Sequence, residues 1–120
     1  MHNFKELKVW QKGIQLAVDM YKQTENFPND EKFGLTSQMR RSAVSIPSNI
    51  AEGCGRKTDK DLSNFLSHSL GSQYELETQL IISKEVQLIA DMEFEKLTSE
   101  LNEIQKMTKT LIDKFSKSNV

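Results

Sequence analysis

The sequence predicts an all-α protein in which four helices pack as one antiparallel, up-down-up-down bundle. Apolar residues recur every three or four positions along nearly the whole chain, which is the period of a helix with one buried face. Glycine and proline are scarce, with five and two copies in 120 residues, so a fold built from many tight turns is disfavoured. This length suits a single domain, residues 1–120, with one hydrophobic core.

The first helix is predicted over residues 7–24. Its apolar stripe alternates spacings of three and four, at Leu7, Trp10, Ile14, Ala17 and Tyr21. The sequence Asn-Phe-Pro-Asn that follows has turn composition, and the residue before a proline is biased away from the helical conformation. We expect the aromatic side chains of this connection, Phe27 and Phe33, to plug the end of the bundle rather than to bind a ligand.

The second helix is predicted over residues 35–54 and contains a proline. Pro47 removes the amide that would bond the carbonyl four residues earlier, which costs about 3 kcal/mol in an ordinary helix interior. Because Ile50 continues the apolar stripe past this point, we expect a kink rather than a stop. The hydroxyls of Ser45 and Ser48 are expected to help satisfy the freed carbonyls.

The third and fourth helices are predicted over residues 59–86 and 91–117. Thr58 is a suitable N-cap for the third, with acidic residues in the first turn complementing the helix dipole. Gly71 lies inside this helix, where glycine is unfavourable, so we expect it to permit close approach of another helix. The fourth helix keeps heptad spacing at Phe94, Leu97, Leu101, Ile104, Thr108, Leu111 and Phe115.

Charge is distributed unevenly along the chain, although the net charge is only -1. Residues 1–60 hold ten Lys or Arg against seven Asp or Glu, whereas residues 61–120 hold six against ten. A protein that binds nucleic acid by phosphate neutralisation is usually more basic overall, so any such binding requires a local patch. The lone Cys54 suits a reducing compartment, and no signal peptide or membrane span is recognisable, so we expect a cytoplasmic protein without membrane contact.

No combination of residues in the chain predicts catalysis, a metal site or a cofactor. Glu75 and Glu77 lie two apart and do not converge on a helix. His68 has no nucleophile pattern around it, and His2 lies at a terminus expected to be flexible. A lone thiol such as Cys54 at a helix end usually acts as a small apolar residue. We therefore expect a protein that is not an enzyme.

The central motif of the second helix, QMRRSAVSIPSNIAEG, closely resembles that of the four helix bundle protein family, also called the 23S rRNA intervening-sequence protein family. The similarity extends over the first three helices, about three-quarters of the chain. Further matching residues are Phe4, Leu7, Val9-Trp10, Phe27-Pro28, Glu31, Phe33-Gly34-Leu35, Arg56, Phe65-Leu66, Gly71-Ser72, Glu75-Leu76-Glu77 and Gln79-Leu80. His68 and Ser69 depart from the small apolar residues that the family tends to carry here.

The resemblance implies an antiparallel four-helix bundle that assembles into a ring-like homo-oligomer, commonly a pentamer. The family is named for reading frames within insertions in the large-subunit ribosomal RNA genes of some bacteria, which does not make the chain a ribosomal subunit. A related group resembles accessory proteins of diversity-generating retroelements, which engage reverse transcriptase and nucleic acid. The implied partners are therefore other copies of the chain and RNA, DNA or a nucleic-acid-processing protein.

Five basic residues are the candidate contacts for such a partner: Arg40, Arg41, Arg56, Lys57 and Lys60. Arginine binds phosphate or carboxylate through a bidentate fork, but salt bridges within or between protomers are the favoured alternative, with Glu52, Glu75 and Glu77 as candidate partners. Because adjacent helical residues differ by about 100° in direction, we expect only one of the paired arginines to serve any one surface. The intervening motif residues, by contrast, are expected to shape the helix and its packing: Ser45, Pro47, Ser48, Asn49, Glu52 and Gly53.

Two functions remain open at this point. One is a non-enzymatic oligomeric bundle that binds nucleic acid, or a protein that processes it, through a repeated basic surface. The other is a structural or protein-interaction module without nucleic-acid binding, which the near-neutral charge favours.

Overall fold

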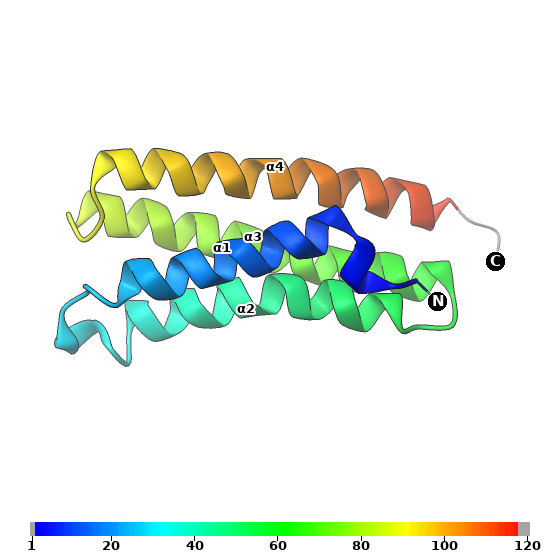
Figure 1. The fold of residues 1–120 in the computed structure, drawn as a ribbon, viewed down its shortest axis with the longest axis horizontal. Helices are drawn as coiled ribbons and strands as arrows, with labels where there is room; N and C mark the ends of the chain where they lie inside the picture. The colour runs from blue at the N-terminus through cyan, green and yellow to red at the C-terminus, as the bar shows by residue number, and fades with distance from the viewer. Residues whose placement is uncertain (1, 118–120) are drawn as a thin grey trace.

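The computed structural model describes residues 2–117 and is an all-α four-helix bundle, as the sequence predicts. Its helices are α1 (Lys8–Thr24), α2 (Leu35–Cys54), α3 (Asp59–Glu85) and α4 (Asp91–Ser116). Two 3-10 turns, η1 (Phe4–Glu6) and η2 (Asn29–Glu31), precede α1 and α2. Figure 1 shows α1 and α3 running in one direction along the long axis and α2 and α4 in the other.

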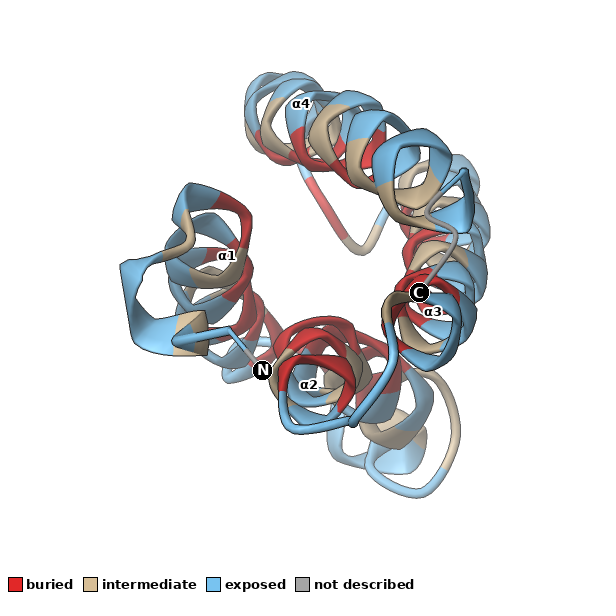
Figure 2. Cartoon of the chain, turned by 90° about the vertical axis from the view of Figure 1, so that its right-hand side faces the viewer, coloured by how far each residue is buried: buried red, intermediate tan, exposed pale blue. Residues whose placement is uncertain are grey.

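The core is a single column along the bundle axis. Figure 2 shows the buried face of each helix turned toward this column. The largest side chains with almost no exposure are Val9, Leu16, Met20, Met39, Ile46, Ile50, Leu66, Gln73, Leu76, Leu80, Leu101 and Ile104. Contacts are most extensive between α2 and α3 and least extensive between α1 and α4. The helix pair that closes the bundle is therefore its least tightly packed seam.

Gln73 is the most deeply buried side-chain amide of the described residues, with 0% exposure. Its Nε2 donates to the hydroxyls of Ser69 (3.2 Å) and Thr108 (3.0 Å). Both hydroxyls use their own protons on backbone carbonyls, those of Ile46 and Ile104. The group links α3 to α2 on one side and to α4 on the other.

Two glycines set the packing of α2 against its neighbours. A Cβ added to Gly13 would lie 3.4 Å from the Cβ of Pro47, so α1 fits closely against the proline ring. A Cβ added to Gly53 would lie only 2.8 Å from the Cβ of Phe65 in α3. Gly71 behaves differently, because it is exposed and no atom lies within 4 Å of its added Cβ. The expected close helix approach at Gly71 is therefore wrong within the chain, since its position on α3 faces outward.

α2 continues as one helix through Pro47, and the kink stays a prediction. Ser48 is exposed, and the Ser45 hydroxyl pairs with that of Ser72 in α3 at 2.8 Å. Asn49 donates to both the carbonyl and the hydroxyl of Ser45, at 2.9 Å each. Within residues 2–117 neither serine hydroxyl bonds the carbonyl that the proline frees. The Ser45 hydroxyl instead joins α2 to α3, and Asn49 bonds within α2.

The end of α3 contains a backbone conformation that usually belongs to glycine. Gln87 has φ of 64°, in the left-handed region. The amide of Leu88 then donates to the carbonyl of Ser83 at 2.8 Å, which closes the helix in a Schellman-type turn. The turn leads directly into Asp91, where α4 begins.

Candidate nucleic-acid interface

The five basic candidates lie in two groups at opposite ends of α2. Arg40 and Arg41 lie in its second turn, whereas Arg56, Lys57 and Lys60 surround the connection to α3. A helix rises by 1.5 Å per residue, so about 24 Å separates the two groups along the axis. The fold does not bring them together into one patch.

Arg40 connects α2 to the end of α1. Its Nε donates to the hydroxyl of Thr24 at 2.9 Å, and a terminal nitrogen donates to the carbonyl of Tyr21 at 3.3 Å. The guanidinium carbon also lies 4.6 Å from the centre of the Tyr21 ring. The last carbonyls of a helix lack helical partners and carry partial negative charge, so a cation is stabilising there. Arg40 is held in place by α1.

Arg41 is exposed, and none of the residues 2–117 places a carboxylate within ion-pair distance of it. Of the carboxylates that the sequence offered as partners, Glu52 forms the expected salt bridge with Arg56 at 3.0 Å, and Glu77 accepts a hydrogen bond from Gln105 at 2.8 Å. The guanidinium of Arg41 is therefore free for an external partner.

Both arginines border one open groove of about 630 Å³ on the outer surface of α1 and α2. The long side chains reach the same hollow although their helical positions diverge, so the expectation that only one serves a given surface is wrong. The η2–α2 connection adds Lys32 and Phe33, and α1 adds Tyr21. Three cations and no carboxylate line the groove. Such a surface attracts anions.

Phe33 does not plug the bundle end, so that expectation is wrong. Phe27 takes this place and is 8% exposed, whereas Phe33 is 90% exposed beside the groove. Glu31 accepts a hydrogen bond from the amide of Leu35 at 3.4 Å, which holds the turn that directs the intervening residues outward. Lys32 Nζ lies 5.5 Å from the Phe33 ring centre. The sequence did not identify Lys32 and Phe33 as groove residues. Nothing in the spacing along the chain shows that Phe27 is buried and Phe33 is exposed.

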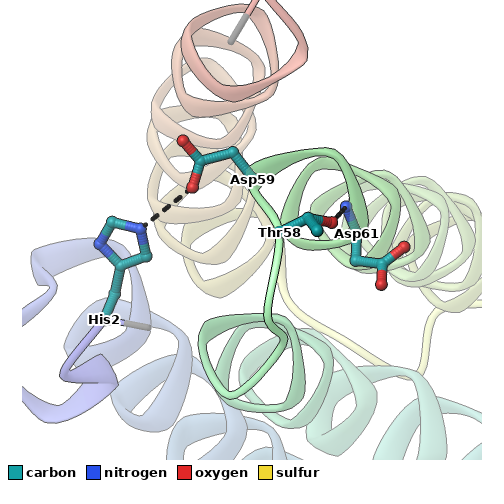
Figure 3. A network of polar contacts seen from close by, with 4 residues as sticks. All are labelled: His2, Thr58, Asp59 and Asp61. Carbon is teal, nitrogen blue, oxygen red and sulfur yellow. Dashed lines mark hydrogen bonds and ion pairs between the residues drawn. The ribbon is translucent and has the colours of Figure 1, made fainter. Parts of the chain in front are cut away.

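The opposite end of α2 mixes its charges. Figure 3 shows His2 turned toward Asp59, with Nε2 3.6 Å from the carboxylate, and the Thr58 hydroxyl capping the amide of Asp61 at 3.1 Å. The backbone amide of His2 also donates to the carbonyl of Cys54 at 3.0 Å, which connects the start of the chain to the end of α2. Two carboxylates alternate with Lys57 and Lys60 here. Carboxylates therefore offset the positive charge at this end, whereas none lines the groove.

The remaining reactive groups are arranged for structure. Burial raises the pKa of the Cys54 thiol, which keeps it protonated and poorly nucleophilic. Burial and the carboxylate of Asp19 raise the pKa of Glu100, across the seam between α1 and α4. A hydrogen bond and charge attraction from Lys12, 2.7 Å away, lower the pKa of Glu103 on the same seam.

Two further properties bear on what the surface can contact. In the part of the chain that the structure describes, no cluster of three or more His, Cys, Asp or Glu side chains could hold a metal ion. Across those same residues, every helix is too short or too polar to cross a membrane.

The fold and the groove together describe a small four-helix-bundle protein with a basic groove on its surface. The chain belongs to the 23S rRNA-intervening sequence protein family, whose family model matches residues 5–110. It is also similar to a crystal structure of a protein of unknown function from the S23 ribosomal protein family of Bacteroides thetaiotaomicron VPI-5482. That match has 27% identity and a TM-score of 0.81, and covers 87% of this chain and 97% of the other. No curated protein matches the chain.

Proposed function

We propose that the chain is a non-enzymatic, cytoplasmic scaffold that assembles with copies of itself and holds nucleic acid on the basic groove. One observation carries the proposal: Lys32, Arg40 and Arg41 line a groove that contains no carboxylate, in a chain whose net charge is -1. Phosphate groups are the natural ligands of such a surface, because each contact releases a counterion. Arg56, Lys57 and Lys60 are proposed as a second, weaker contact.

Self-assembly would compensate for the small number of cations in a single groove. Three cations neutralise at most three phosphates, which corresponds to a slope of about -2 to -3 in log affinity against log salt. A ring, such as a pentamer, repeats the groove and multiplies its effect by avidity. Support for assembly comes from apolar side chains that are 40–45% exposed on α1 and α3, namely Ile14, Val18, Tyr74 and Ile81.

A protein-interaction module without nucleic-acid binding is the second candidate. The near-neutral net charge favours it, since nucleic-acid-binding domains usually carry an excess of positive charge. In this case the groove would accept acidic side chains of a protein that processes nucleic acid, or of a neighbouring copy.

Salt-titrated binding to a structured RNA and a duplex DNA, combined with light-scattering mass, separates the two. The scaffold proposal expects Arg41→Ala to weaken binding and reduce the salt slope by about 0.7 to 0.9, without changing the assembly mass. Lys106→Ala is the matched control, because Lys106 is an exposed cation of α4 outside the groove. The double variant of Lys57 and Lys60 should have a smaller effect than Arg41→Ala. An intact assembly that binds neither nucleic acid at low salt would refute nucleic-acid binding.

Assembly has its own test. A chain that remains monomeric at micromolar concentration contradicts the ring. If Arg41→Ala changes the mass of the assembly and leaves nucleic-acid affinity unaltered, the protein-interaction role replaces the scaffold role.

A further inference from the structure

Phe33 is the most exposed large apolar side chain of the described residues, at 90%. Its neighbour in the same connection, Phe27, is buried, so the bundle end is already filled. An aromatic ring left in water gains nothing from the hydrophobic effect in the single chain. The ring is therefore available to stack against a ligand.

The surroundings of Phe33 specify the charge of that ligand. Lys32 and Arg41 border the same groove, and no carboxylate lines it. Arg40 is tied to Thr24 and Tyr21, so it adds a fixed positive charge at the edge without being free to move. The ligand must present a flat apolar face and negative charge within a few ångströms of each other.

An unpaired nucleotide has both properties. Its base offers a π-face to stack on an aromatic side chain, and its phosphate is bound by nearby Lys or Arg. In a duplex the base faces are stacked on each other and only the phosphates remain, which leaves Phe33 uncovered. Acidic peptides supply the charge but generally lack the flat ring, so they match only half of the surface.

We infer that this groove binds single-stranded nucleic acid, with a base stacked on Phe33 and the adjoining phosphates held by Arg41 and Lys32. The inference rests on the proposed function and narrows it from nucleic acid in general to unpaired segments. Stacking does not read the sugar, so single-stranded RNA and single-stranded DNA are both ligands.

The test compares labelled single strands of about 12 nucleotides, oligouridine and oligothymidine, with an RNA duplex of the same length, by fluorescence anisotropy on the full chain. Both single strands should bind more tightly than the duplex. Phe33→Ala should weaken single-strand binding by a factor of about 5 to 150 and leave duplex binding unchanged. Phe33→Trp should restore it. Met92→Ala is the control, because Met92 is 80% exposed at the start of α4, outside the groove.

The variants of Phe33 should fold, because the side chain is exposed. The mass of the assembly is measured by light scattering on the same samples, to show whether the substitution changes assembly. Equal affinity for single strand and duplex, with Phe33→Ala neutral, overturns the inference and leaves the proposed function standing. A changed assembly mass in Phe33→Ala overturns it as well, because the ring then contacts another copy. Absence of binding to all three probes overturns the nucleic-acid function itself.

Discussion

The contact between α2 and α3 at Gly53 offers the sharpest test of the packing, through the variant Gly53→Ala. The added Cβ would lie 2.8 Å from the Phe65 Cβ, 2.9 Å from the Leu62 Cδ1 and 3.3 Å from the Leu62 carbonyl oxygen. The leucine methyl can rotate away, but the Phe65 Cβ is fixed to its backbone. The helices must therefore separate by roughly half an ångström to restore ordinary contact.

The free energy of this separation outweighs the helical preference of alanine. Overpacking a tight contact costs about 1–3 kcal/mol, whereas replacing glycine by alanine inside a helix gains at most about 1 kcal/mol. We expect Gly53→Ala to lower the free energy of unfolding by about 1–2 kcal/mol, measured by urea denaturation at one fixed protein concentration. The melting temperature should fall by several degrees.

Gly71→Ala is the matched control, since the same change in α3 meets no atom within 4 Å. It should raise the free energy of unfolding by up to about 1 kcal/mol. The two variants thus have opposite expected signs. If Gly53→Ala stabilises the chain as much as Gly71→Ala does, the close approach of α2 and α3 is incorrect.

Three further predictions concern single side chains. Burial and the carboxylate of Asp19 raise the pKa of Glu100 in the folded chain above its ordinary value of 4.5. The ionised carboxylate therefore destabilises the fold at neutral pH, and protonation removes this destabilisation as the pH falls toward 4.5. Glu100→Gln should therefore stabilise the bundle by less than about 1 kcal/mol at pH 7 and by a smaller amount at pH 4.5, as measured by melting curves at the two pH values. An equal stabilisation at the two pH values would contradict this prediction. Gln87→Gly should raise the free energy of unfolding by up to about 1 kcal/mol, because glycine adopts a φ of 64° without strain; a loss in urea denaturation would argue against that turn. Arg40→Ala should lower it by about 1–2 kcal/mol through two lost bonds to α1, while Arg41→Ala stays within about 0.5 kcal/mol; similar urea midpoints for both would contradict the distinct roles.

The bundle was predictable because apolar periodicity is sustained along α1, α2 and α4 and returns at both ends of α3, whose middle buries the polar residues Ser69, Ser72 and Gln73. The heptad spacing of α4, for example, places Leu97, Leu101 and Ile104 in the core, where they are almost fully buried. Periodicity decides which face of a helix is apolar, and turn residues decide where the helices are separated. These two signals suffice for the fold class.

The candidate site was predictable only in part, because its geometry depends on contacts between helices. Adjacent arginines look equivalent in the sequence, yet Arg40 is held by the carbonyl end of α1 and Arg41 is free. Likewise, the turn at η2 buries Phe27 and exposes Phe33, although both lie in the same connection. The outward face of Gly71 and the anchoring of His2 also follow from tertiary placement, which spacing along the chain does not encode.

The amide of Gln73 has a consequence for how the helices align along the axis. A seam of similar aliphatic residues can slide by one heptad at little cost, because every layer resembles the next. Moving α4 by seven residues would place Leu101 or Phe115 opposite Gln73 in place of Thr108, and a buried N–H without a partner costs about 1–3 kcal/mol. The hydrogen bond of Gln73 to Thr108 thus favours the native register of α3 and α4 over registers shifted by one heptad.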